Sequence, residues 1–180
     1  WDKMWNRVWL LAGLASDVKE VGDWLNFQIG LHDLVVVRSS PVEVKAFYNV
    51  CRHRGNKLVH GDFGKKYKCF ECSFHSWLWK VDGSLMRVTD QDSFAPGALE
   101  SKDGEDLNLK PVHAEEFAGL IFISFDPDPI PLKTYLSGMG PILESYQLDK
   151  MTVIRDVQME MPANWKLALN AFTEAYHVHS

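Results

Sequence analysis

Two short stretches of this chain each combine a thiol with an imidazole, and they constrain the fold more than any other feature. They run Cys51-Arg52-His53 and Cys72-Ser73-Phe74-His75, with 18 residues between His53 and Cys72. Residues 51 and 53 cannot face one point from a regular helix, and Cys72 and His75 bracket a tight turn. The sequence therefore predicts two loop tips that the rest of the chain holds together.

Two thiolates and two imidazoles form the ligand set of a [2Fe–2S] centre of the Rieske kind, in which two His replace two Cys on one iron. Neutral imidazoles lower the charge of the cluster and raise its reduction potential, so that it accepts electrons from a flavin or ferredoxin. Two alternatives stay open. A Cys2His2 set also suits structural zinc, and Cys69 with Cys72 forms a C-x-x-C pair that suits zinc or a redox dithiol. Iron–sulfur is favoured because zinc fingers usually keep like ligands together.

The composition indicates a soluble globular protein with one domain and part of another, since 46% of its 180 residues are hydrophobic and 24% are charged. A net charge of −5 argues against a nucleic-acid binder, and no apolar run approaches the ~18 residues of a membrane span. No export signal opens the chain, and three cysteines are an odd number for a disulfide framework. We therefore expect a cytoplasmic protein without nucleic-acid or membrane partners.

Short runs of branched and aromatic residues, separated by turn signals, predict a mainly β region from about Val8 to Phe125. Strands are expected at Val8–Leu11, Trp24–Ile29, Leu34–Arg38, Val42–Tyr48, Lys66–Phe70, Leu107–Val112 and Leu120–Phe125. Asp82-Gly83 predicts a tight hairpin between Trp77–Trp79 and Leu85–Val88. The expected fold is a small antiparallel sandwich or barrel that holds both Cys/His loops at one end.

Three prolines within Asp126–Pro131 predict a linker or domain boundary, because proline disrupts both helix and ladder pairing. Beyond it, we expect a short helix over Leu132–Tyr146, interrupted near Gly138–Pro141, and a strand over Thr152–Met161. Helical spacing begins after Asn164, which is an N-cap candidate. We therefore predict a first domain at residues 1–126 and the start of an α+β domain at residues 127–180.

The residues around the two loops resemble the Rieske motif of the ring-hydroxylating oxygenase alpha subunits. The segments are Cys51-Arg52-His53-Arg54-Gly55 and Cys72-Ser73-Phe74-His75-Ser76-Trp77. Rieske proteins of respiratory complexes are less similar, because each of their ligand loops carries an additional Cys and the two form a disulfide, whereas Cys69 is the single spare thiol of this chain. One departure is Ser76, where the oxygenase family usually has Gly, although a small residue still fits there.

A second segment, from Asn164-Trp165-Lys166 to Glu174-Ala175-Tyr176-His177, resembles the start of the catalytic domain of the same family. The resemblance implies that His177 is the first ligand of a mononuclear non-haem iron and that Glu174 bridges to a Rieske His of the neighbouring subunit. The other ligands of such an iron, a second His and a carboxylate, fall beyond Ser180. His179 is not expected to replace them, because residues two apart on a helix point about 200° away from each other. We therefore expect a piece of a longer protein.

The resemblance implies the N-terminal part of the alpha subunit of a Rieske non-haem iron oxygenase. The implied cluster ligands are Cys51, His53, Cys72 and His75. Electrons then pass from NAD(P)H through a reductase, sometimes with a ferredoxin, to the cluster and across a subunit boundary to the iron. That iron activates O2 to hydroxylate or demethylate an organic, often aromatic, substrate. The family commonly forms trimers, and a beta subunit is an open possibility. The alternatives are a Rieske-type ferredoxin without its own catalytic site and a zinc-stabilised structural module.

Overall fold

The computed structural model describes residues 1–66, 68–100, 106–157 and 159–173. The contacts divide the chain into two compact units, Trp1–Lys150 and Met151–Ser180, and each is described by itself. None of the helices in the described ranges has the length and apolar character that crossing a bilayer requires. The end of the first predicted domain at residue 126 stays a prediction.

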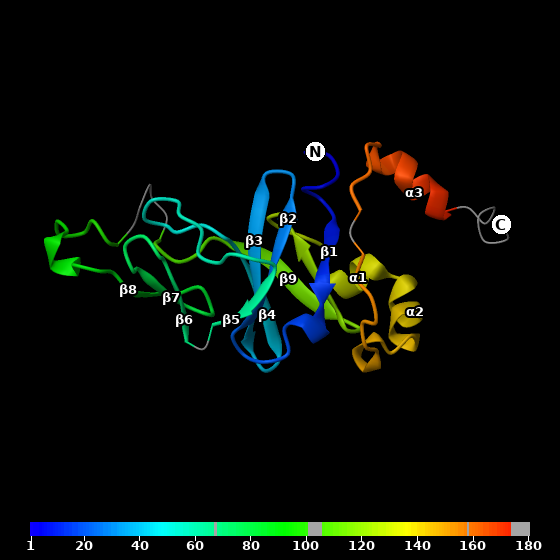
Figure 1. The fold of residues 1–180 in the computed structure, drawn as a ribbon, viewed down its shortest axis with the longest axis horizontal. Coiled ribbons are helices and arrows are strands. Elements are labelled where there is room, and N and C mark those ends of the chain that lie inside the picture. The colour runs from blue at the N-terminus through cyan, green and yellow to red at the C-terminus, as the bar shows by residue number, and fades with distance from the viewer. Residues whose placement is uncertain (67, 101–105, 158, 174–180) are drawn as a thin grey trace. The chain divides into compact units, whose positions relative to one another are not determined.

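The first unit is built around one large antiparallel sheet (Figure 1). Within the described residues it has seven strands, which follow one another across the sheet as β1 (Trp9–Leu14), β10 (Leu120–Ser124), β9 (Pro111–Phe117), β4 (Glu43–Tyr48), β3 (His32–Ser40), β2 (Asp23–Ile29) and β5 (Phe63–Lys65). Every neighbouring pair runs antiparallel. The mainly β, antiparallel architecture expected from the sequence is confirmed.

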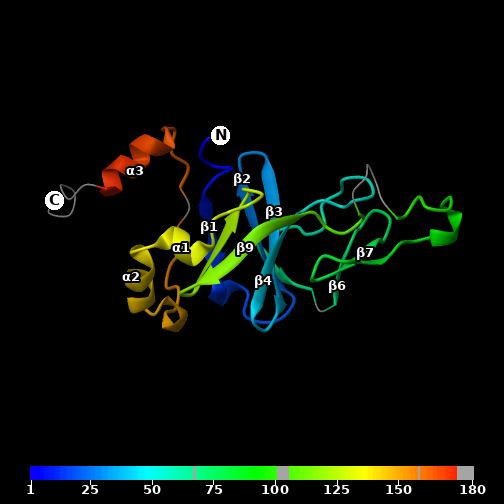
Figure 2. The same ribbon diagram turned by 180° about the vertical axis from the view of Figure 1, so that it is seen from behind.

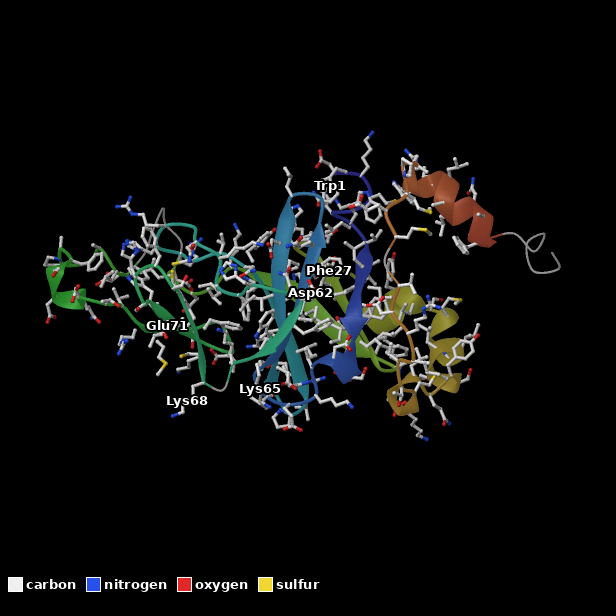
Figure 3. All side chains as sticks on the ribbon, viewed as in Figure 1. Trp1, Phe27, Asp62, Lys65, Lys68 and Glu71 are labelled. Atoms are coloured by element: carbon white, nitrogen blue, oxygen red, sulfur yellow. The ribbon has the colours of Figure 1, made fainter. Side chains whose placement is uncertain are left out.

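A second, smaller sheet carries the other Cys/His loop. In the described part of the chain its strands are β6 (Cys69–Glu71), β7 (Leu78–Lys80) and β8 (Leu85–Arg87). The amide of Gly83 donates to the carbonyl of Lys80 (2.9 Å) in the β7–β8 turn, so the predicted hairpin is confirmed, although residues 81–84 rather than Asp82-Gly83 alone connect its strands. In both ribbon views this sheet lies on one side of the large sheet (Figures 1 and 2). Figure 3 labels Asp62, Lys65, Lys68 and Glu71, which mark the path of the chain between the two sheets.

The central strand β3 is covered on both faces, because Leu34–Val37 has no exposed side chain and successive residues of a strand face opposite ways. Val35 and Val37 join a core shared with the small sheet, which contains Trp24, Phe47, Cys51, Leu58, Val59, Phe70, Cys72, Trp77, Trp79, Val88, Leu107 and Leu109. Leu34 and Val36 join the core of the opposite face, with Leu10, Val18, Leu25, Val44, Ala46, Ile121 and Ile123. The first core contains both cysteines of the Cys/His loops, so packing of the two sheets fixes where those loops meet.

Two of the predicted strands overlap the observed strands by only two residues each. The prediction over Leu107–Val112 was wrong in part, because β9 begins at Pro111. Leu107 and Leu109 are buried, but their backbones bond to other groups: the indole N–H of Trp79 donates to the carbonyl of Leu107 (2.8 Å), and the amide of Leu109 donates to the β7–β8 turn. The prediction over Lys66–Phe70 missed β5 and placed the start of β6 three residues early.

Short helices follow the proline-rich segment of the first unit. They are α1 (Leu132–Leu136) and α2 (Met139–Ser145), so the helix is interrupted at residues 137–138, at the start of the predicted interruption, whose remaining residues belong to α2. Leu132 is buried against Trp9 and Phe122, which joins α1 to the large sheet. The indole N–H of Trp9 also donates to the carbonyl of Ile130 (2.7 Å). Single 3-10 turns are found at Ala15–Asp17, Gln91–Ser93 and Leu148–Lys150.

The second unit contains helix α3 (Trp165–Thr173). Its first turn confirms the predicted N-cap, because the side-chain oxygen of Asn164 accepts a hydrogen bond from the amide of Lys166 (3.0 Å). The strand predicted over Thr152–Met161 was wrong, since the described residues of that segment form no strand and are exposed. An alternating pattern forms a strand only when a partner strand pairs with it. Glu174, His177 and His179 lie outside the described residues.

The hydrogen bond of Trp79 gives a test of the first core. Trp79→Phe leaves the buried carbonyl of Leu107 without its indole donor, whereas the indole N–H of Trp24 is buried without a partner among the described residues. We expect Trp79→Phe to lower the free energy of unfolding by roughly 1–3 kcal/mol more than the matched variant Trp24→Phe. Urea unfolding curves of the two variants measure this difference, and equal losses would show that the bond contributes nothing.

Candidate metal centre

The segments Cys51–Asn56 and Cys72–Trp77 fold into the same six-residue turn. In each, the amide of the first residue donates to the carbonyl of the sixth, at 2.7 Å in one turn and 3.0 Å in the other. The amide of the fifth residue donates back to the carbonyl of the first, at 2.9 Å in both. The two predicted loop tips are therefore copies of one backbone structure, one leaving the large sheet and the other joining β6 to β7.

The fifth residue of each turn has a left-handed backbone. Gly55 has a φ of 75° and Ser76 a φ of 53°. Glycine adopts this conformation freely, whereas a residue with a Cβ does so at a cost of about 1–2 kcal/mol. The sequence-based view of Ser76 considered only the size of its side chain, but the backbone geometry is what makes this position unusual.

Substitutions at the two fifth positions should therefore change stability in opposite directions. Ser76→Gly relieves the left-handed strain and is expected to raise the free energy of unfolding by up to about 1 kcal/mol. Gly55→Ala introduces the strain and is expected to lower it by roughly 1–2 kcal/mol, because nothing within 4 Å would contact the added Cβ. Urea unfolding measures both, with Ser93→Gly as a control at a position without a left-handed backbone. A loss of stability in Ser76→Gly would contradict the explanation.

The thiols of the two turns meet in the first core. Cys51 and Cys72 are 3% and 1% exposed, and their side chains share a hydrogen bond. The backbone amides two and three positions after each cysteine donate to its sulfur, which again repeats between the turns. Burial raises the pKa of Cys51. Burial acts the same way on Cys72, but the hydrogen bonds from the two amides, from Cys51 and from Asn56 together hold the pKa of Cys72 below its ordinary value.

The imidazoles of the two turns also meet. The ring centroids of His53 and His75 are 4.6 Å apart, with the rings inclined at 69°. His53 is half-buried and stacks on Trp77, at 4.7 Å and with the ring planes 6° apart, whereas His75 is exposed and contacts Phe74 at 4.0 Å. Trp77, which is 4% exposed, therefore covers one imidazole and leaves the other accessible to solvent.

The donor set fits a two-iron cluster. Its four groups form a thiol pair and an imidazole pair, which is how a Rieske centre distributes its ligands, with two Cys on one iron and two His on the other. A tetrahedral zinc ion needs all four around one point. The pairing of thiol with thiol and of imidazole with imidazole instead offers one pair of like ligands to each of two metal ions. The spare thiol, Cys69, is a half-buried residue of β6 opposite Lys80.

Sequence reasoning missed Asn49, which precedes the first turn and is hydrogen-bonded to Leu58 and Val59, both of which follow it. It is 2% exposed, and its side chain makes four hydrogen bonds. The amide nitrogen donates to the carbonyl of Val59 (3.0 Å) and to the carboxylate of Asp33 (3.1 Å). The amide oxygen accepts from the backbone of Leu58 and Val59, both at 3.0 Å. The only local signal is a polar residue placed between a buried strand and Cys51.

Asp33 belongs to the same hydrogen-bond network, because its carboxylate accepts a hydrogen bond from the side chain of Asn49. Its carboxylate accepts hydrogen bonds from Asn26 (2.6 Å), Gln28 (3.1 Å) and Asn49, and it forms an ion pair with Lys57. Burial raises the pKa of Asp33, but the hydrogen bonds from Lys57, Asn26 and Asn49 outweigh it and hold that pKa below its ordinary value. The ionised carboxylate therefore ties Lys57, one residue beyond the first turn, to the large sheet.

The structure thus brings together four of the predicted site residues, namely Cys51, His53, Cys72 and His75. The two others, Glu174 and His177, lie outside the described residues, so their roles stay predictions. Arg54, beside the first turn, is exposed.

A family model described as "Rieske [2Fe-2S] domain" matches residues 8–103. The glycine betaine monooxygenase oxygenase subunit of Pseudomonas aeruginosa is 31% identical over 97% of the chain and 39% of its own length. The carnitine monooxygenase oxygenase subunit of Escherichia coli K12 is 30% identical over 98% of the chain and 46% of its own length. Benzene 1,2-dioxygenase subunit alpha of Pseudomonas putida is 33% identical over 98% of the chain and 39% of its own length. The chain therefore spans less than half the length of these curated relatives.

The solved structures that resemble this chain include Rieske-type oxygenases. One is a quaternary ammonium Rieske monooxygenase, described in connection with carnitine oxidation and inter-subunit electron transfer. The match covers 99% of this chain and 48% of the monooxygenase chain, with a TM-score of 0.87 and 28% sequence identity. A naphthalene 1,2-dioxygenase with bound indole matches 73% of this chain and 29% of its own chain, with a TM-score of 0.64 and 34% sequence identity. These names do not single out the predicted aromatic substrate, because glycine betaine and carnitine are quaternary ammonium compounds, whereas benzene and naphthalene are aromatic.

Proposed function

The chain belongs to the Rieske [2Fe–2S] domain family, and from that premise we propose that it is the cluster-bearing part of a Rieske-type terminal oxygenase subunit. The observation that carries this proposal is the pairing of thiol with thiol and imidazole with imidazole in twin turns. Cys51 and Cys72 are the proposed ligands of one iron, and His53 and His75 of the other. When bound, such a cluster takes up and passes on single electrons.

The surrounding residues suit that role. The two thiols are buried in the first core, and amide N–H groups directed at their sulfurs favour negative charge there. His75 is exposed, so its imidazole is the proposed route by which electrons enter and leave. Trp77 covers His53 and excludes water from that side.

The rest of the oxygenase is proposed by analogy with the relatives. We propose that a reductase, with or without a ferredoxin, delivers electrons from NAD(P)H and that the protein is a cytoplasmic homo-oligomer, a trimer or an assembly with a beta subunit. Glu174 is the proposed bridge between subunits, and His177 the proposed ligand of a non-haem iron that uses O2. Inter-subunit electron transfer, which is described for the quaternary ammonium monooxygenase, supports this arrangement.

The substrate is proposed to be a small organic compound. The names of the relatives make glycine betaine and carnitine the first compounds to test, with benzene as the aromatic alternative. A Rieske-type ferredoxin is the second candidate, but the relatives match 97–98% of the chain, including the segment beyond residue 126, and all three are oxygenase subunits.

The experiment is reductase-driven oxygen consumption by the complete subunit, with these compounds as substrates. Glu174→Gln is expected to keep the visible spectrum of the cluster and to lower oxygen consumption by roughly 10–100-fold, the usual effect of removing a group that orients a metal ligand. Unchanged consumption would exclude the bridging role of Glu174. A cluster that accepts electrons, without oxygen consumption on any substrate, would favour the ferredoxin.

A further inference from the structure

The sixth residue of each turn reaches across to the other turn. In the second turn this residue is Trp77, which stacks on His53 of the first. In the first turn it is Asn56, whose side-chain amide donates to the sulfur of Cys72 (3.7 Å) and to the hydroxyl of Ser73 (3.1 Å) in the second. The two turns therefore contact each other at two places, at the imidazole of His53 and at the sulfur of Cys72.

The bond from Asn56 adds a donor to one sulfur. Both cysteines already receive backbone amides two and three positions downstream, and Cys72 receives the side-chain N–H in addition. An N–H group directed at a ligand sulfur stabilises negative charge on that sulfur. The amide of Asn56 therefore favours negative charge on this sulfur.

Adding an electron to an iron–sulfur cluster increases the negative charge on its sulfur ligands, and hydrogen bonds to those sulfurs are among the factors that set the reduction potential. A donor stabilises the reduced form more than the oxidised form. We propose that Asn56 is a positioning residue that raises the reduction potential of the cluster through its N–H bond to Cys72. This inference rests on the proposed ligation of the cluster by Cys72.

A purely structural role is the competing explanation, because Asn56 also bonds to Ser73 and to the carbonyl of Lys57 (3.1 Å). The midpoint potential separates the two roles. Asn56→Leu keeps a side chain of similar size without a donor, and it is expected to make reduction about threefold to tenfold less favourable, a fall of roughly 30 to 60 mV for one electron. Asn56→Asp replaces the donor with a carboxylate and is expected to fall further.

The matched control is Ser73→Ala, which removes one acceptor of the Asn56 amide but leaves the bond to Cys72. The Asn56 side-chain amide has two N–H groups for its three acceptors, so protein-film voltammetry of the cluster-loaded protein should give this control a potential no lower than that of the unmodified protein. Unchanged potentials in both Asn56 variants, or an equal fall in Ser73→Ala, would overturn the proposal. Loss of the cluster from both Asn56 variants would also overturn it, because Asn56 would then be required for assembly.

The same series separates this inference from the proposed function. If the unmodified protein binds no iron–sulfur cluster, the proposed function fails, and the inference fails with it. If the unmodified protein shows the cluster and only the predicted shift is missing, the proposed function stands and the role of Asn56 is rejected.

Discussion

A Cys72→Ser variant is expected to lose its iron and acid-labile sulfide, whereas Cys69→Ser is expected to keep both. Cys72 is buried beside Cys51 and receives four hydrogen bonds that favour its thiolate, which is the form that binds metal. Cys69 is a residue of β6, half-buried beside its neighbouring strand. Iron and sulfide analysis and the visible spectrum of the two purified variants check this expectation.

The comparison of the two serine variants decides between two uses of the cysteines. Equal loss of metal from both would favour the C-x-x-C alternative, in which Cys69 and Cys72 act together. Retention of the cluster by Cys72→Ser would contradict the assignment of this residue as a ligand. Because both variants replace a thiol with a hydroxyl in neighbouring parts of one segment, their difference isolates the contribution of the individual sulfur.

The second large effect is expected at Asn49. Asn49→Ala leaves the buried amides of Leu58 and Val59 without their acceptor, and each such orphaned group costs about 1–3 kcal/mol. Val59 and Asp33 also lose a donor. Together these losses should lower the free energy of unfolding by roughly 3–6 kcal/mol and release the base of the first loop. Urea unfolding measures the loss, and iron content shows whether the loop still holds the cluster.

Gln28 offers a matched control, because its exposed side-chain amide also donates to Asp33 (3.1 Å). Gln28→Ala is expected to change the free energy of unfolding by about 0.5 kcal/mol or less, as for most surface substitutions. If Asn49→Ala were no more harmful than Gln28→Ala, the buried network would not be what holds the first loop in place.

The features predicted correctly from the sequence obey local rules. The hairpin at Asp82-Gly83 and the N-cap at Asn164 each depend on a few adjacent residues. The antiparallel architecture follows from short strands separated by turn signals. The shared backbone structure of the two turns could not be predicted, because the histidine is the third residue of one turn, His53, and the fourth residue of the other, His75.

The errors share a different cause, which is dependence on distant parts of the chain. Leu107 and Leu109 are apolar because they fill the first core, not because they belong to a strand. Apolar and polar residues alternate over Thr152–Met161, but the described residues of this segment form no strand. Asn49 is important through bonds to residues nine, ten and sixteen positions away, which no local pattern reveals.

The central claim is that Cys51, Cys72, His53 and His75 hold one two-iron cluster. The most direct measurement is metal and sulfide analysis of anaerobically purified protein, combined with EPR of the reduced sample. We expect two irons and two acid-labile sulfides per chain, and nitrogen hyperfine couplings from two imidazoles. A colourless protein with one zinc per chain and no sulfide would contradict the account.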